Sequence, residues 1–185
     1  MKKIVIGLVF IAIGALAYAF IPFEKIAIAQ TPAGEEEIKW YTWEEAIQLS
    51  EKNPKKIFID VYTDWCGWCK KMDATTFKDP AVVKFMNENF YAVKFDAEQK
   101  EAIQYNGYTL KFIPSGSRGI HELAYSLLDG RLSYPSYVYL DETQARITIS
   151  PGYKQVDGMM KELRYIGGDH YKDKSFDEFL SSLGK

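Results

Sequence analysis

The stretch Ile57-Phe-Ile-Asp-Val-Tyr-Thr-Asp-Trp-Cys-Gly-Trp-Cys-Lys-Lys-Met72 contains both cysteines of the chain. Residues 57–62 are almost continuously apolar and rich in β-branched and aromatic side chains, which is typical of a strand that is covered on both faces. The cysteines follow after a short turn. The stretch therefore predicts a central parallel strand that leads directly into the N-terminus of a helix.

Helical and extended patterns alternate on both sides of this stretch. Helices are expected from capping and spacing, and strands from runs of β-branched and aromatic residues. Expected helices cover residues 43–53, 121–128 and 156–166, and the further strands cover 91–95, 136–141 and 146–150. Two more helices are expected, one that begins at Pro80 and carries Val82, Phe85 and Met86, and a last one capped by Ser175 that carries Phe176, Phe179 and Leu180. The last two strands are close enough to pair as an antiparallel hairpin. The order predicts an α/β fold with three layers, in which helices flank a central mixed sheet.

Residues 101–118 look like an insertion in this alternation. Asn106-Gly107 lies between two extended runs, which is a strong hairpin signal. We expect a protruding β-hairpin there, followed by a loop over residues 114–119.

Composition limits the possible function. The chain has 185 residues, of which 47% are hydrophobic and 26% charged, and its formal net charge is −2. These values are typical of one globular domain. No cluster of basic residues longer than two is present, so sequence-independent binding of nucleic acids is not expected.

The two cysteines are three residues apart, Cys66 and Cys69, at the expected start of a helix. Unpaired amide groups and the helix dipole at such a place favour a negatively charged sulfur. A thiolate at Cys66 can attack a disulfide, and Cys69, one turn further, can attack back and release the reduced product. Cys66 is expected to be the more exposed of the two.

Asp60 lies in the middle of the apolar strand. Burial of its carboxyl raises the pKa, so it can exchange a proton with the cysteines, and Lys94 on the neighbouring strand opposes the shift if the two pair. An exposed Asp60 on an edge strand is the alternative. Tyr134-Pro135 precedes a strand, and that peptide bond is a candidate for the cis form.

The motifs resemble the thioredoxins. The stretch that contains the cysteines is similar to the active-site strand and helix of that family, and residues 134–141 are similar to its cis-proline strand. The resemblance covers about residues 40–183 and also points to exported thioredoxin-related proteins. It implies that Cys66 is the nucleophile, Cys69 the resolving thiol, Asp60 the buried acid and base, and Pro135 the cis proline.

Other residues follow from the resemblance with less specificity. Lys94 falls where the family often has a lysine near the buried carboxyl. The side chains flanking the thiols and the cis proline are candidates for substrate binding: Trp65, Gly67, Trp68 and Tyr134. Trp68 stands where cytosolic thioredoxins commonly have proline, and this leaves the direction of electron flow open.

Zinc binding, haem attachment and a structural disulfide each account less well for the cysteine pair. A zinc site needs more ligands than one pair, and His121 and His170 lie far apart in the sequence, so we expect both to be structural or exposed. Haem attachment needs a histidine where Lys70 stands. A purely structural disulfide over so short a loop stabilises weakly. We therefore expect no metal and no cofactor beyond the redox-active pair itself.

The N-terminus resembles an export segment. Lys2 and Lys3 precede an apolar run over residues 4–23, and Ala27-Ile28-Ala29 fits a cleavage site, with Ala17-Tyr18-Ala19 as a second one. The run is also long enough to remain as a membrane anchor. The expected organisation is a signal peptide or anchor over residues 1–29, a linker over 30–39, and a thioredoxin-like domain over 40–185. The folded part is then periplasmic or otherwise outside the cytoplasm.

The expected function is reduction of disulfides in protein substrates by an exported oxidoreductase. Its electrons must cross a membrane, so a membrane-embedded thiol relay is the expected donor. Two alternatives remain: a disulfide oxidase, and a non-catalytic binding module of the cell envelope that uses the inserted hairpin.

Overall fold

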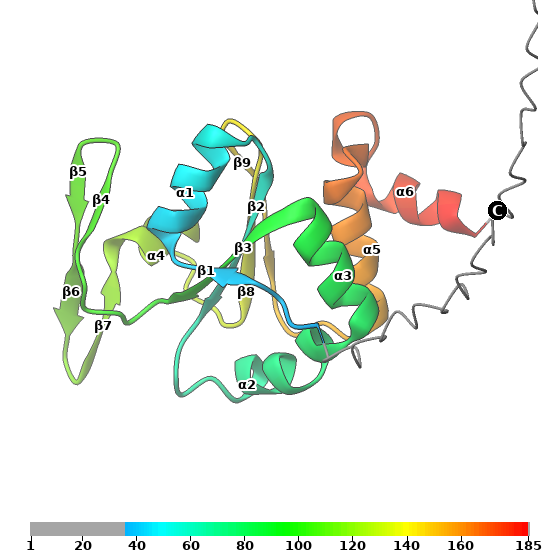
Figure 1. Cartoon of the computed structure of the whole chain (residues 1–185). Helices are drawn as coiled ribbons and strands as arrows, with labels where there is room; N and C mark the ends of the chain where they lie inside the picture. Colours follow the sequence, from blue (N-terminus) through cyan, green and yellow to red (C-terminus); the bar gives the residue numbers. More distant parts are fainter. Residues whose placement is uncertain (1–35, 185) are drawn as a thin grey trace, which may run out of the picture. The chain divides into compact units, whose positions relative to one another are not determined.

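The computed structural model describes residues 36–184, and the expected export segment lies outside these residues. A five-stranded sheet forms the centre, in the order β1-β3-β2-β8-β9 (Figure 1). Its strands are β1 (Trp40–Tyr41), β2 (Lys56–Tyr62), β3 (Phe90–Asp96), β8 (Ser136–Leu140) and β9 (Arg146–Pro151). The first three are parallel, while β8 and β9 are antiparallel to their neighbours. The prediction of a mixed central sheet is confirmed.

The helices cover both faces of the sheet. They are α1 (Trp43–Lys52), α2 (Gly67–Ala74), α3 (Pro80–Asn89), α4 (Glu122–Leu127), α5 (Val156–Gly167) and α6 (Phe176–Leu183), with short 3₁₀ turns η1 (Thr76–Lys78) and η2 (His170–Lys172). One core cluster packs α1 and α4 against Ile57, Ile59 and Val61. A second packs α2, α3 and α5 against the face that contains Phe58. Since side chains alternate along a strand, Asp60 shares the face of Phe58 and α2.

Local capping signals set the helix ends as expected. Thr42 and Glu45 form a reciprocal capping box at the start of α1, and Ser175 and Glu178 do the same for α6. The Asp79 carboxylate accepts hydrogen bonds from the first amides of α3, which begins with a proline. These contacts are local in sequence, which explains why the sequence predicts them well.

The insertion contains two hairpins. The expected one is β4 (Ile103–Tyr105) paired with β5 (Tyr108–Leu110), turning at Asn106-Gly107. The expected loop over residues 114–119 is wrong, because it forms most of a second hairpin of β6 (Phe112–Ser115) and β7 (Arg118–His121). Gly116 has a positive φ at the turn, and Pro114 is tolerated because this sheet has only two strands.

The expected linker also needs correction at its end. Ile38 is buried in the core, and the backbone amide of Lys39 donates a hydrogen bond to Asn87 on α3. Residues 38 and 39 therefore pack on the domain instead of linking to it. Among residues 36–184, no helix is both long and apolar enough to cross a membrane.

Candidate active site

The two cysteines lie at the N-terminus of α2 and are joined by a disulfide, so the structure describes the oxidised form. Cys66 is the N-cap residue, and its Sγ accepts a hydrogen bond of 3.1 Å from the backbone amide of Cys69. The same amide would stabilise a negative charge on Sγ after reduction. The helix start thus provides the electrostatic environment that the sequence predicts.

Exposure differs between the cysteines in the expected direction, although both are buried. Cys66 is 5% exposed and Cys69 is 1% exposed. The neighbouring tryptophans are open to solvent by contrast, Trp65 at 49% and Trp68 at 55%. The Trp68 ring lies 5.1 Å from that of Tyr153, and the ammonium of Lys71 lies above it. Two exposed indoles therefore flank a nearly covered sulfur.

Asp60 is buried in the centre of the sheet, as the sequence predicts. Its register partners are Lys94 on β3 and Tyr137 on β8. Burial raises the pKa of Asp60 to about 6, even though the charge and hydrogen bond of Lys94 lower it. The Oδ1 atom has no hydrogen-bond partner among the described residues, so it is free to take a proton. The alternative of an exposed edge position is wrong.

Lys94 connects Asp60 to the helix that contains the cysteines. Its ammonium lies 3.1 Å from Oδ2 of Asp60 and also contacts Oδ1 of Asp73 on α2. Asp73 is four residues after Cys69, one helical turn further along. The negative charge of Asp73 raises the pKa of Asp60 further. The Asp73 carboxylate, the Lys94 ammonium and the buried Asp60 carboxyl therefore form a chain of charged groups from the surface inward.

The Tyr134–Pro135 peptide bond is cis, which confirms the expectation. The Tyr134 ring meets the Trp65 ring edge to face at 5.8 Å between centroids. Partial burial raises the pKa of the Tyr134 hydroxyl to about 12, with help from the charges of Glu98 and Asp96. The residues that precede Cys66 and Pro135 thus lie side by side, as one surface.

Gly67 has no steric need to be glycine. A Cβ atom built there meets no neighbouring heavy atom within 4 Å. The position therefore presents open space beside Cys66, which fits contact with a substrate but does not require it.

The histidines have structural contacts. His121 is fully buried: its Nδ1 accepts from the Leu123 amide as the cap of α4, and its Nε2 lies 3.0 Å from the carbonyl of Glu101. Burial lowers the pKa of His121, which keeps it neutral. His170 stacks on Phe179. Within residues 36–184 we find no group of three His, Cys, Asp or Glu side chains that could hold a metal ion.

Sequence reasoning missed three residues of the site: Asp73, Glu98 and Arg118. Asp73 could have been found, because its four-residue spacing from Cys69 places both on neighbouring turns of one helix. Glu98 accepts a 3.1 Å hydrogen bond from Nε1 of Trp65. The guanidinium of Arg118 lies 4.3 Å from the centre of the Trp65 ring. Contacts of this kind join distant segments, and no local pattern indicates them.

Comparison with known proteins identifies the family. The family model Thioredox_DsbH, described as a protein of unknown function, DUF255, matches residues 30–154. The chain belongs to this family. The solved structure of a DsbH oxidoreductase has a TM-score of 0.51 at 16% identity, covering 75% of this chain and 87% of that one. A thioredoxin-fold protein from Helicobacter pylori has a TM-score of 0.53 at 18% identity, covering 71% and 80%. The fold is therefore thioredoxin-like.

A curated relative is similar over a short segment. The thiol:disulfide interchange protein DsbD of Pectobacterium atrosepticum is 48% identical over 31 residues. This segment is 17% of the present chain and 5% of that protein. An uncharacterized protein of Caenorhabditis elegans, which is 41% identical over 64 residues, is matched over 34% of this chain and 9% of its own length. The chain thus spans less than a tenth of either relative.

Proposed function

We propose that this protein is an exported thiol–disulfide oxidoreductase that reduces disulfides in protein substrates. The observation that carries the proposal is the Cys66–Cys69 disulfide at the start of α2, with an amide donating to Cys66 Sγ. Membership of the Thioredox_DsbH family and the segment shared with an interchange protein support an oxidoreductase-type role. The buried Asp60 carboxyl, which faces the same helix, supports an exchange of protons with the thiols.

The reaction begins from the reduced dithiol. The Cys66 thiolate attacks one sulfur of the substrate disulfide, forming a mixed disulfide, and the other substrate sulfur leaves and takes a proton. Cys69 loses its proton, with Oδ1 of Asp60 as the proposed acceptor, and attacks Sγ of Cys66. The second substrate sulfur then leaves as a thiolate and takes up the proton held by Asp60. The substrate gains two electrons and two protons, and the protein becomes the disulfide form.

Substrate binding is assigned to the surface around the cysteines. The proposed contacts are the exposed indoles of Trp65 and Trp68, the open space at Gly67, and Tyr134 with Pro135. Lys94 supports Asp60 by holding its Oδ2. No bound cofactor is proposed, because two sulfurs suffice to carry the electron pair.

The electron donor is proposed to be a thiol relay in the membrane. The dithiol is consumed in each turnover, so an exported reductase needs a reductant that reaches it outside the cytoplasm. A segment of this chain is similar to part of an interchange protein, which supports a donor of that chemical class.

A redox titration against glutathione tests the direction of the reaction. A reductase is expected to have an equilibrium potential below roughly −200 mV, because it must give electrons to protein disulfides. The measurement follows the oxidised fraction of the Cys66–Cys69 pair by the mass added on thiol alkylation. A potential well above this value would favour the oxidase alternative instead.

Export is tested by sequencing the N-terminus of the protein recovered from the cell envelope of its producing cells. A signal peptide predicts a start at residue 30, or at residue 20 if the second site is used. An intact start at Met1 in a membrane fraction indicates the anchored form. Recovery only from the cytoplasm would contradict the proposed location.

A further inference from the structure

The β6–β7 hairpin is firmly held at its base and exposed at its tip. The buried His121 ends β7, and its backbone amide donates to the carbonyl of Ala97 at 2.7 Å. The backbone of Lys111, just before β6, bonds to Glu122 through both its amide and its carbonyl. Residues 113–118, in contrast, are exposed. Backbone pairing of β6 with β7 continues to Ser115 and Arg118, so the tip is joined to the base, and side chains make its contacts with the rest of the domain.

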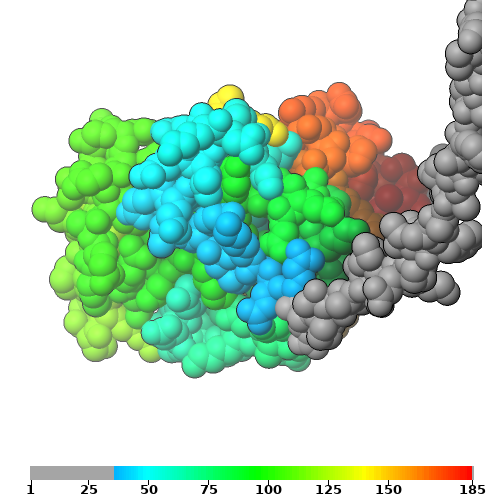
Figure 2. All heavy atoms as spheres, viewed as in Figure 1, coloured from blue at the N-terminus to red at the C-terminus, as the bar shows by residue number. Residues whose placement is uncertain are grey.

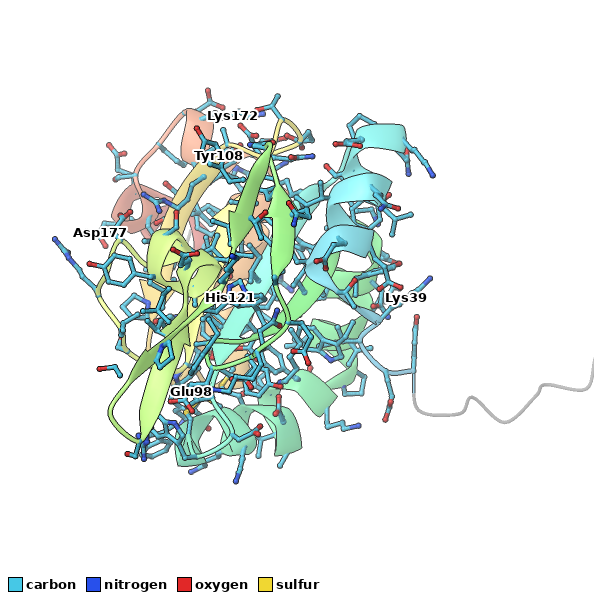
Figure 3. All side chains as sticks on the ribbon, turned by 90° about the vertical axis from the view of Figure 1, so that its left-hand side faces the viewer. Lys39, Glu98, Tyr108, His121, Lys172 and Asp177 are labelled. Carbon is cyan, nitrogen blue, oxygen red and sulfur yellow. A yellow bond between two sulfur atoms is a disulfide. The ribbon has the colours of Figure 1, made fainter. Side chains whose placement is uncertain are left out.

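The two hairpins point to opposite ends of the domain. In Figure 1 the tip of β6–β7 is directed toward the end where α2 lies, and the tip of β4–β5 toward the other end. Figure 3 shows the same arrangement, with Tyr108 and Glu98 labelled far apart on this face. In Figure 2 the segment that contains both hairpins, coloured green, forms the side of the domain next to α1. Only the second hairpin is thus directed toward the cysteines.

Arg118 connects this tip to the site. Its guanidinium stacks on the indole of Trp65, whose N–H is bound by Glu98 and whose ring edge meets Tyr134. Among residues 36–184, no carboxylate pairs with Arg118. The cation–π contact thus ties the hairpin tip to Trp65, the residue before Cys66.

We infer that Arg118 is a specificity-determining positioning residue, which holds the β6–β7 hairpin as a wall beside Cys66. The wall lets small thiol compounds and disulfides in flexible, extended polypeptide segments reach Cys66. It hinders the approach of disulfides on compact, folded protein surfaces. The contact with Trp65 places the exposed tip next to the residue that precedes Cys66. This inference rests on the proposed function for its substrate class, but the wall itself can be measured without any enzymatic activity.

The experiment compares two alkylating reagents on the reduced protein. Iodoacetamide is small, whereas a maleimide with a long polyethylene glycol chain is bulky, and mass spectrometry reads the modification of Cys66 in both. Arg118→Ala is expected to raise the rate of Cys66 modification by the bulky maleimide about threefold, which matches the free energy of one exposed cation–π contact. The rate with iodoacetamide should stay within about twofold of the wild-type rate. Arg118→Lys retains a cation above the ring and should restore most of the wild-type ratio.

Two further variants distinguish an effect of the wall from an effect of lost positive charge. Arg164→Ala removes the same charge from the exposed side of α5 and should leave both rates unchanged. Gly119→Val places a side chain where the Phe112 ring and the Ile113 carbonyl stand, so it disrupts the hairpin whatever Arg118 does. It should raise the rate with the bulky reagent more than Arg118→Ala does. If the ratio of the maleimide rate to the iodoacetamide rate is the same in wild type, Arg118→Ala and Gly119→Val, the inference is overturned.

Activity then tests the substrate class. In Arg118→Ala, kcat/KM for folded insulin is expected to rise about threefold through a lower KM, while kcat/KM for a disulfide in an unstructured peptide stays the same. A parallel change for both substrates would contradict selection by the wall. If the wild-type protein reduces neither substrate, the proposed function fails, and the alkylation ratio still decides whether the wall exists.

Discussion

Serine in place of Cys66 is expected to abolish disulfide reduction, with a loss of at least about 10³-fold in the insulin assay coupled to dithiothreitol. The pKa of a serine hydroxyl is too high for it to form an attacking anion at neutral pH. The helix start then has no thiolate to stabilise. The remaining thiol of this variant, Cys69, is 1% exposed and is therefore poorly placed to substitute for Cys66. The structural cost is small, because the side chains are similar in size.

The controls distinguish the enzyme from a binding module. Asp79→Ala removes the cap of α3 and reports how much a loss of about 1 kcal/mol in stability alone changes activity. Activity in Cys66→Ser equal to that of the parent would refute the assignment of the nucleophile. A parent protein with no activity that still binds its partners would favour the non-catalytic module, with the β4–β5 hairpin as its contact surface.

Asparagine in place of Asp60 is expected to stabilise the protein at pH 7 by about 2–3 kcal/mol while slowing turnover by at least about tenfold. The pKa of Asp60 rises from 3.8 in the unfolded chain to about 6 in the fold. Between these values the unfolded state has lost its proton and the folded state has kept it. The free energy of unfolding therefore falls as pH rises through this window, and the neutral amide of asparagine avoids that loss.

Urea unfolding at several pH values measures this effect. The parent protein should lose about 2–3 kcal/mol between pH 4 and pH 7 relative to Asp60→Asn, because a shift of one pKa unit corresponds to about 1.4 kcal/mol. A constant difference between the two proteins across this range would show that Asp60 does not titrate as described.

Two neighbouring substitutions check the sign of the pKa shift. Lys94→Met removes the charge that lowers the pKa of Asp60, so the pKa should rise above about 6. Asp73→Asn removes a charge that raises it, so the pKa should fall. Carboxyl chemical shifts measured by NMR during a titration report both. Shifts in the same direction would contradict the chain of Asp73, Lys94 and Asp60.

Local sequence signals predicted most of the fold. The capping pairs Thr42 with Glu45 and Ser175 with Glu178 fixed two helices, and Asn106-Gly107 fixed the first hairpin, because each acts within a few residues. The second hairpin was missed, since residues 114–119 have the composition of a loop. Their pairing depends on the anchored base at His121, which lies outside the segment.

The sequence predicts those parts of the site whose chemistry depends on their position within a single strand or helix. The apolar strand around Asp60 favoured a buried carboxyl over the exposed alternative, and the cysteine pair after that strand was expected at a helix start. The surroundings of Cys66 were not predictable in the same way. Glu98 and Arg118 lie 33 and 53 positions after Trp65 in the chain, and only the tertiary fold brings them to it.

The most direct test of the central claim is a trapping experiment with Cys69→Ser. If Cys66 attacks substrate disulfides and Cys69 resolves the mixed disulfide, this variant should accumulate covalent adducts through Cys66, seen by mass spectrometry and removed by dithiothreitol. The double variant with serine at both positions should form none. Absence of adducts in Cys69→Ser, under conditions in which the parent protein reduces the same substrate, would contradict the account.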